Sequence, residues 1–351
     1  MTHYFRPVLR HDNARPGTAL TLADGWTWFD TVELRQRDAS PVMIPVSEVP
    51  SETLDRLTSQ RAPICGLDFA APRLMGILNV TPDSFSDGGE HYAHDVALQH
   101  ARDMADQGAA IVDVGGESTR PGATEVPARE ETARVIPVIR QIRKDGRVPV
   151  SIDTRKATVA CAAHDAGAGL VNDVAGFSFD KELAPLCAEK NLPVCIMHAQ
   201  GDPQTMQVDP RYDDVVLDVY DFLAERVNAL IGIGIERHRI IVDPGIGFGK
   251  TQEHNLTLLR NMSIFHGLGC ALLLGASRKR FIADIGKAPQ PSDRVPGSVA
   301  VALAGVMQGV QILRVHDVKA TRSALDLWSA IHRGQADKAD VSPSHGGRTN
   351  A

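Results

Sequence analysis

The sequence has no block of like charges, no long apolar run and no paired cysteines, and each absence excludes a class of protein. The 37 Lys and Arg against 43 Asp and Glu leave a net charge of -6 over 351 residues. Without a basic cluster, we expect no nucleic-acid partner. No run of about 18 apolar residues occurs, and the N-terminus lacks the apolar region of a signal peptide, so the sequence predicts neither membrane insertion nor export.

The cysteines and the glycine-rich segments exclude further sites. The five cysteines are scattered and form no C-x-x-C pair. We therefore predict neither a disulfide framework nor a zinc site, and free thiols favour the reducing cytoplasm. The segment PGIGFGKT at 244–251 has Pro244 in place of the first glycine of a phosphate-binding loop, and GIGIER at 232–237 lacks the third glycine of a dinucleotide fingerprint.

From residue 73 onward, short runs rich in Val and Ile alternate with longer segments of helical period. This alternation is typical of βαβ units in a parallel sheet. Eight such runs favour an α/β fold of the (β/α)₈ TIM barrel type, because a doubly wound sheet usually stops at about six strands. The predicted strands cover residues 74–80, 110–114, 148–153, 170–174, 193–198, 239–243, 271–275 and 311–315.

The two ends of the chain depart from this pattern. Alternating apolar and polar positions at 21–35 predict strands, and 47–63 predicts a loop with one short helix between prolines. We predict a small β-rich N-terminal extension over residues 1–70, the barrel over 71–335 and a flexible polar tail over 336–351. If the extension is an appendage, removal of residues 1–65 should leave the chemistry of the barrel intact.

Polar side chains stand at the carboxyl ends of all the predicted strands. In a barrel these ends meet at one rim, where the active sites of this architecture lie, so we expect one site there. The alternative for any single Asp or Asn is a turn or a helix cap, but caps do not account for Lys, Arg and His at the other ends. Carboxylates and amides suit a heterocycle rich in hydrogen bonds, and Arg and His suit an anion. The residues are Asn79, Asp113, Asp153, Asn172, His198, Asp243, Ser277, Arg278, Lys279, Arg314 and His316.

Two loops that contain glycine and proline follow the first two predicted strands, and lids over barrel mouths are built from such segments. Here GILNVTPDSFSDGG and DVGGESTRPGA resemble the two signature segments of dihydropteroate synthase. The segments SIDT, NDVAG, DPGIGFGK, GASRKRF and RVHDV resemble its remaining blocks, in the same order. The resemblance covers residues 73–333 and implies a barrel enzyme that joins 6-hydroxymethyl-7,8-dihydropterin diphosphate to 4-aminobenzoate, with release of diphosphate.

The resemblance also implies roles for individual residues and a homodimer formed through helices late in the barrel. The pterin would be held by Asp153, Asn172, Asp243 and Lys279, and the expected substrate-binding set also includes Asp113, Met197 and Ser277. Mg²⁺ would bind Asn79 and the diphosphate, which suits its preference for oxygen ligands. Arg314 and His316 would clamp the diphosphate together with Thr119 and Arg120. Phe85, Pro121, Phe248 and the stem of Lys279 would line the aminobenzoate pocket, and Asp87 would accept the proton from the amine.

The chain departs from the family pattern at two positions, and two other functions are alternatives to the synthase. Arg280 stands where many members carry Ser, which leaves open how the aminobenzoate carboxylate is held, and Ala157 replaces a frequent Pro. A methyltetrahydrofolate:corrinoid methyltransferase would share the pterin residues but should lack STRPGA and the Arg-x-His clamp, both of which are present. A non-catalytic pterin-binding relative would have lost loop residues that are intact here.

Overall fold

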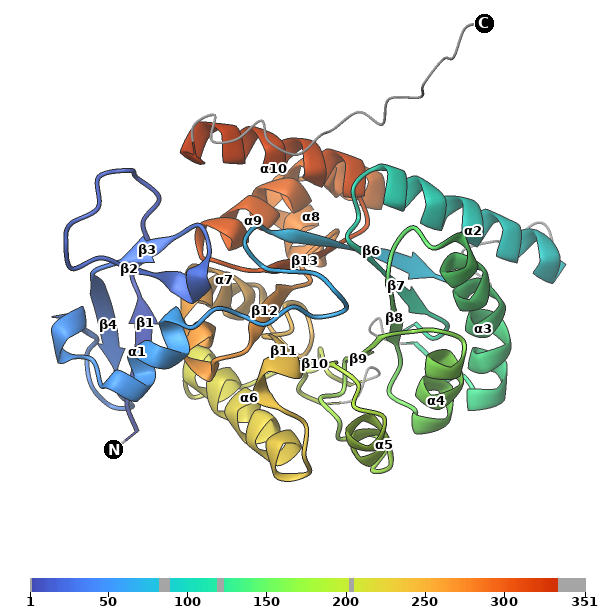
Figure 1. Cartoon of the computed structure of the whole chain (residues 1–351), viewed down its shortest axis with the longest axis horizontal. Helices are drawn as coiled ribbons and strands as arrows, with labels where there is room; N and C mark the ends of the chain where they lie inside the picture. Colours follow the sequence, from blue (N-terminus) through green and yellow to red (C-terminus); the bar gives the residue numbers. More distant parts are fainter. Residues whose placement is uncertain (1, 82–88, 119–122, 202–204, 334–351) are drawn as a thin grey trace, which may run out of the picture.

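The centre of the molecule is a closed barrel of eight parallel strands, which run around it in the order β10-β11-β12-β13-β6-β7-β8-β9 (Figure 1). The computed structural model describes residues 2–81, 89–118, 123–201 and 205–333. The predicted (β/α)₈ barrel is confirmed, and every strand overlaps its predicted position. The strands are β6 (Arg73–Asn79), β7 (Ile111–Gly115), β8 (Val150–Asp153), β9 (Leu170–Asp173), β10 (Val194–Met197), β11 (Ile240–Asp243), β12 (Ala271–Leu274) and β13 (Ile312–Val315).

Helices surround the barrel and cover the outer faces of the strands (Figure 1). Both faces of each strand are therefore buried, which explains the nearly continuous apolar runs. Among the described helices none is long and apolar enough to cross a membrane. They are α2 (Gly89–Asp106), α3 (Ala128–Asp145), α4 (Ala157–Asp165), α5 (Leu183–Glu189), α6 (Val215–Gly232), α7 (Gln252–Arg260), α8 (Arg280–Gly286), α9 (Val295–Met307) and α10 (Val318–Arg333), with short 3-10 turns η4 (Arg237–Arg239), η5 (Met262–Leu268) and η6 (Pro291–Arg294).

The N-terminal extension folds into a small lobe beside the barrel (Figure 1). Its three-stranded antiparallel sheet has the order β1-β4-β5, and β2 pairs with β3. The β-rich extension and its single short α-helix, predicted from the alternation and the prolines, are both present. The elements are β1 (Tyr4–Pro7), β2 (Leu20–Thr21), η1 (Leu22–Asp24), β3 (Trp28–Phe29), β4 (Thr31–Arg35), β5 (Val42–Pro45), η2 (Val46–Glu48) and α1 (Ser51–Thr58).

The lobe is packed tightly against the barrel's outer layer. Tyr4 is 1% exposed, and its hydroxyl donates to the Asp221 carboxylate of α6 at 2.9 Å. The Trp26 indole N–H donates to the Val306 carbonyl of α9 at 2.8 Å. Both rings belong to the main hydrophobic core of the barrel. The lobe and the barrel therefore share one core, in contrast to an appendage.

The segment between α1 and β6 crosses the end of the barrel that faces the viewer in Figure 1. Ile64 and Phe69 are 4% and 5% exposed, and they pack on the interior side chains at the start of the strands. An isolated antiparallel β-bridge between Ile64 and Leu67 closes a turn in this segment. The contacts of Ile64 argue against the expectation that residues 1–65 are dispensable, because the loss of Ile64 would uncover part of the floor of the barrel. The boundaries predicted at residues 70 and 335 stay predictions, and residues 336–351 lie outside the described part.

Trp26→Ala should lower the free energy of unfolding by about 3–5 kcal/mol, because it removes a buried indole and leaves the Val306 carbonyl without its donor. Denaturant unfolding followed by circular dichroism measures the change. Met43→Ala is the matched control, since Met43 lies in the same lobe with 54% of its surface exposed. If both variants unfold like the wild type, the lobe does not stabilise the barrel.

Candidate active site

The strands aim polar side chains into the barrel above its apolar floor. Side chains two residues apart in a strand point to the same face. Ile111, Leu170 and Ile312 are interior floor residues, so Asp113, Asn172 and Arg314 also point inward, nearer to the carboxyl ends. By the same spacing, Cys195 precedes Met197 and Ile241 precedes Asp243. The expected convergence at one rim follows from this register.

Arg314 joins two carboxylates that come from the neighbouring strands β7 and β8. Its Nε donates to Asp113 Oδ2 at 2.7 Å, and one terminal nitrogen donates to Asp153 Oδ2 at 2.6 Å. The Asn172 amide donates to the same Asp113 oxygen at 2.9 Å. Four strands, β7, β8, β9 and β13, thus contribute to one polar cluster. The sequence assigned Arg314 to an anion clamp, but in this structure its guanidinium faces carboxylates.

Burial dominates the electrostatics of this cluster. Asp113 is fully buried and Asp153 is 8% exposed. Burial raises the pKa of Asp153, although the Arg314 guanidinium opposes the shift. Asp113 Oδ1 has no hydrogen-bond partner among the described residues. A buried oxygen without a hydrogen bond lowers the stability of the fold, so Asp113 Oδ1 is available to accept a hydrogen bond from a ligand.

Asp243 and Lys279 occupy the neighbouring part of the mouth. One oxygen of Asp243 accepts the Gly245 N–H at 2.8 Å, so the turn-forming alternative considered for such residues applies here as well. Burial raises the pKa of Asp243, and Lys279 and Arg314 partly offset the shift. The Lys279 ammonium lies 3.8 Å from the centroid of the Phe248 ring. Two of the four residues expected to line the aminobenzoate pocket are therefore in direct contact.

Ser277 and His316 form a pair at the ends of β12 and β13. The Ser277 hydroxyl lies 3.0 Å from His316 Nδ1 and also accepts the His316 backbone N–H at 3.2 Å. Next to them, Arg278 donates to both oxygens of Asp317 at 2.9 and 2.5 Å. Arg278 follows β12, and its ion pair with Asp317 holds the loop after β12 beside the end of β13.

Of the remaining predicted site residues, the structure describes Asn79 and Met197, and the others lie outside its described part. Asn79 ends β6 in a half-buried position opposite Gly115, and Met197 ends β10 opposite Asp243 with 3% of its surface exposed. Within the described ranges, no three His, Cys, Asp or Glu side chains lie close enough to hold a metal together. Five predicted residues lie outside the described part of the chain: Phe85, Asp87, Thr119, Arg120 and Pro121.

Comparison with known proteins agrees with this geometry. Residues 75–316 match the family of pterin-binding enzymes. The chain is 45% identical to the dihydropteroate synthase of Escherichia coli K12 over 272 residues, which is 78% of this chain and 96% of that protein. The chain belongs to the dihydropteroate synthase family.

Solved structures of family members have the same fold. The Xanthomonas albilineans dihydropteroate synthase, solved with 4-aminobenzoic acid, is 46% identical with a TM-score of 0.72, over 76% of this chain and 96% of that one. The Yersinia pestis dihydropteroate synthase, solved in a complex with a sulfonamide drug, is 45% identical with a TM-score of 0.72, over 76% of this chain and 97% of that one. The family match begins at residue 75, so the N-terminal lobe lies outside it.

One departure from the dihydropteroate synthase pattern has a structural counterpart. Ala157 begins α4, and its backbone N–H donates to Asp180 Oδ2 at 2.8 Å. Proline lacks this N–H, so the frequent family residue could not make the contact. At the other departure, the Arg280 side chain is 92% exposed and lies 3.6 Å from Asp284.

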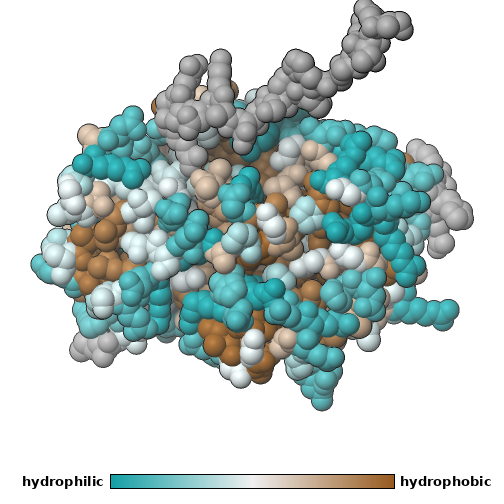
Figure 2. All heavy atoms as spheres, viewed as in Figure 1, coloured by the Kyte–Doolittle hydropathy of each residue, from teal (hydrophilic) through white to brown (hydrophobic). Residues whose placement is uncertain are grey.

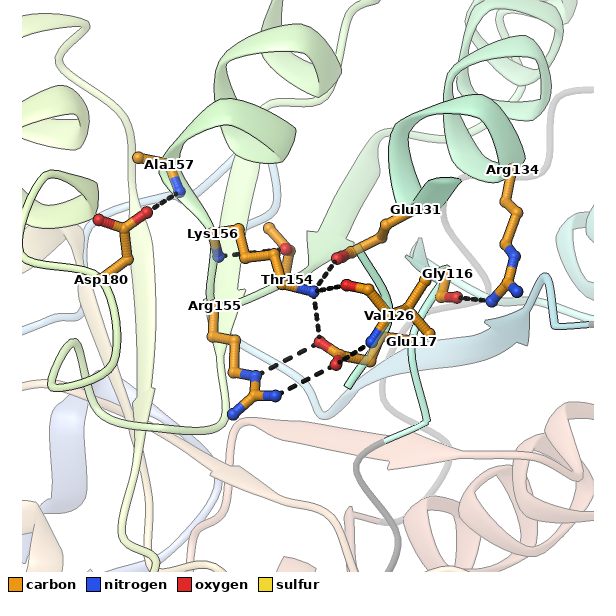
Figure 3. A network of polar contacts seen from close by, with 10 residues as sticks. All are labelled: Gly116, Glu117, Val126, Glu131, Arg134, Thr154, Arg155, Lys156, Ala157 and Asp180. Carbon is orange, nitrogen blue, oxygen red and sulfur yellow. Dashed lines mark hydrogen bonds and ion pairs between the residues drawn. The ribbon is translucent and has the colours of Figure 1, made fainter. Parts of the chain in front are cut away.

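A buried ionic network holds the base of the second signature loop (Figure 3). The Lys156 ammonium donates to Glu117 at 3.0 Å, to Glu131 at 2.8 Å and to the Val126 carbonyl. Glu117 also accepts the Val126 N–H at 3.0 Å and pairs with Arg155. Glu117 and Val126 flank the loop on either side, and Lys156 follows Asp153 by three residues, so the network links the loop to the polar cluster.

Another buried ammonium holds the loop after β11, and sequence reasoning missed its role. Lys250 Nζ donates to the carbonyls of Gly245 and Phe248 at 2.9 and 3.0 Å and lies 2.9 Å from His198 Nδ1. Burial lowers the pKa of Lys250 to about 7, and burial beside Lys250 lowers the pKa of His198 to about 2. His198 is thus a neutral acceptor under this loop. The only sequence signal was the rejected phosphate-loop motif that contains Lys250.

Lys156→Met should lower the free energy of unfolding by about 3–5 kcal/mol, because Glu117 and Glu131 would keep buried charges without their shared cation. Denaturant unfolding at neutral pH measures the loss. Lys181→Met, at an exposed position, should change stability by no more than about 0.5 kcal/mol.

The effect should also depend on pH in a defined direction. Burial alone would raise the pKa of Glu117, but its hydrogen bonds from Arg155, Val126 and Lys156 lower it overall. A lowered folded-state pKa stabilises the fold above the unfolded value of about 4.3, and this contribution disappears as the pH falls through the folded-state pKa. The gap between wild type and Lys156→Met should narrow in acid. A gap that is constant or wider in acid contradicts the ionic role.

Proposed function

We propose that the chain catalyses the formation of 7,8-dihydropteroate from 6-hydroxymethyl-7,8-dihydropterin diphosphate and 4-aminobenzoate. The observation that carries the proposal is the convergence of Asp113, Asp153, Asn172 and Arg314 at one rim, with Asp243 and Lys279 beside them. Membership of the dihydropteroate synthase family and the 4-aminobenzoic acid bound by the Xanthomonas albilineans relative support it.

The pterin is proposed to bind deep in the mouth. The 2-amino-4-oxo edge of a pterin presents a row of N–H donors, and Asp153, Asp243 and Asn172 supply buried acceptors. Charged acceptors in a water-poor site bind such donors more strongly than they would in water. Arg314 keeps Asp153 and Asp113 in place, which supports a positioning role for Arg314 in preference to the anion clamp. Met197 would pack against the flat bicycle.

The diphosphate is proposed to lie at the lip of the mouth. Its departure breaks the bond between the pterin methylene carbon and oxygen, and the aminobenzoate nitrogen then bonds to that carbon. The Ser277 and His316 pair is proposed to supply hydrogen-bond donors to the diphosphate, together with Thr119 and Arg120. Lys279, held against Phe248, would order the aminobenzoate ring, and Asp87 would accept the proton that the amine loses. Catalysis then consists mainly of positioning and leaving-group stabilisation.

Magnesium is proposed to assist the leaving group. Mg²⁺ commonly keeps several waters and takes only one or two protein ligands next to substrate phosphates. The Asn79 carboxamide, half-buried at the end of β6, offers an oxygen ligand that fits this pattern. When bound, the ion would neutralise charge that develops on the diphosphate oxygens.

A homodimer, a cytoplasmic location and sulfonamide binding are further proposals. Leu327 and Ile331 of α10 are 65% and 75% exposed, which supports an interface on this late helix. Ile331→Glu should then convert a dimer to a monomer in sedimentation experiments, whereas a monomeric wild type contradicts the proposal.

The five free cysteines support a reducing compartment. The sulfonamide complex of the Yersinia pestis relative supports sulfonamide binding here.

Lys279→Ala and Asp153→Ala should each lower the turnover of the purified protein by about 100-fold or more, because each removes a charged group from the proposed site. Diphosphate release in the presence of pterin diphosphate, Mg²⁺ and 4-aminobenzoate measures turnover. Lys144→Ala, exposed in the last turn of α3, is the matched control and should keep wild-type activity.

The same assay separates the alternatives. Release that depends on 4-aminobenzoate is expected for the synthase. A wild type that binds the pterin but releases no diphosphate is a non-catalytic relative, and normal turnover in both site variants discredits the assigned residues. Circular dichroism of the variants distinguishes lost chemistry from lost fold.

A further inference from the structure

A cavity lies at the opposite end of the barrel from the proposed active site. It has a volume of about 500 Å³, within the range of small-molecule sites. Its walls come from the loops that enter the strands: residues 146–149 lead into β8, Gly167 and Gly169 into β9, 190–193 into β10, and Arg239 into β11. Because four-residue strands separate the two ends by about 13 Å, the cavity shares no residue with the mouth.

The charged side chains of the cavity wall are all basic. The ionisable side chains that line it are Cys65 and five basic residues, and no Asp or Glu is among them: Arg143, Arg147, His164, Lys190 and Arg239. Arg147 pairs with Asp106 at 2.7 Å and Lys190 lies 3.6 Å from Asp165, and both of these acids are largely exposed. Two of the five are therefore partly neutralised from outside the cavity.

Arg143 and Arg239 form no ion pair among the described residues. Arg143 donates to the Val148 carbonyl at 3.5 Å, and Arg239 donates to the Asn191 carbonyl at 2.5 Å. A carbonyl satisfies a donor but leaves the positive charge in place. A guanidinium has five N–H groups arranged as a fork that matches phosphate and carboxylate oxygens.

The backbone is shaped around these side chains. Gly167 has φ of +109°, and a Cβ there would lie 2.8 Å from Cγ of Arg143. Glycine at this position therefore leaves room for the Arg143 side chain in its present conformation. Burial raises the pKa of Cys65 to about 11, so its thiol is neutral and does not cancel the positive charge. Val148, Pro149, Leu192 and Pro193 add an apolar wall. Hydrophilic residues cover the surface above α3 and α4, on the face shown in Figure 2.

We propose that this cavity is a binding site for a small organic phosphate, held by Arg143 and Arg239 with Arg147, His164 and Lys190 around it. The volume exceeds what a bare phosphate fills, and the apolar wall would contact the organic part of the ligand. The phosphate group would receive charge-assisted hydrogen bonds from the two unpaired guanidinium groups. The inference does not depend on the proposed function, because no residue of the mouth takes part.

The site also joins the two parts of the chain. Cys65 belongs to the segment that leads from the N-terminal lobe into β6, and its thiol donates to the Gly169 carbonyl at 3.2 Å. A ligand in the cavity would therefore contact both this segment and the loops that enter β8 to β11. We expect binding to stabilise the folded chain, by an amount that grows with the logarithm of the ligand concentration once this exceeds the dissociation constant.

Isothermal titration of the full chain tests the proposal, at constant ionic strength maintained with potassium chloride. The probes are inorganic phosphate, adenosine monophosphate and glucose 6-phosphate, which separate the phosphate contribution from the nucleoside and sugar contributions. We expect saturable binding of one equivalent at the cavity, tighter for at least one ester than for inorganic phosphate. The double variant Arg143→Gln with Arg239→Gln should weaken binding by about tenfold or more, because it removes both positive charges that would face the phosphate.

Arg140→Gln is the matched control, since Arg140 is exposed on the same helix as Arg143 and does not line the cavity. It should bind like the wild type. Binding that is unchanged in the double variant belongs to another site and overturns the proposal, as does the absence of binding to the wild type. If the double variant misfolds, tungstate soaked into wild-type crystals decides: a heavy-atom peak between the two guanidinium groups supports the site, and its absence contradicts it.

Discussion

The mouth of the barrel depends on one guanidinium held between two buried carboxylates. Arg314 on β13 contacts Asp113 on β7 and Asp153 on β8, which lie two and three strands further around the barrel, and the Asn172 amide completes the cluster. Buried charges are tolerated only when they are paired and hydrogen-bonded, so none of these residues can be exchanged alone without cost. The carboxylate acceptors are already aligned before a ligand binds. The cluster therefore limits the shape of the ligands that the mouth of the barrel can bind.

The same principle is repeated at the edges of the site, where buried ammonium groups hold loops. Lys156 binds two glutamates at the base of the second signature loop (Figure 3). Lys250 binds carbonyls of the loop that carries Phe248. A lysine that is enclosed in this way restrains several backbone segments at once, which a pair of apolar side chains cannot do with comparable directionality. The rigid surroundings reduce the entropy cost of ordering the groups that would contact a substrate.

Local patterns predicted the barrel, and non-local contacts decided what the patterns could not. The Val- and Ile-rich runs placed all the barrel strands, because a strand buried on both faces is apolar over its whole length. The convergence of Asp113, Asp153, Asn172 and Asp243 followed from the architecture, since parallel strands end at one rim. The partners of Arg314 did not follow, because a rim position does not determine which of several nearby carboxylates the side chain reaches. The role of Lys250 and the neutral state of His198 arise from tertiary burial, and the shared core of Tyr4 and Trp26 depends on residues far away in the chain.

The distant partners of the N-terminal lobe have a consequence for biosynthesis. Tyr4 pairs with a residue 217 positions later, and Trp26 with one 280 positions later. Ribosomes deliver the N-terminus first, so the lobe is complete long before α6 and α9 exist. During that interval its aromatic rings lack their docking surface and present apolar area to other nascent chains or to chaperones. A chain with such separated contacts is expected to reach its final packing slowly, because the long loops must close before those contacts contribute.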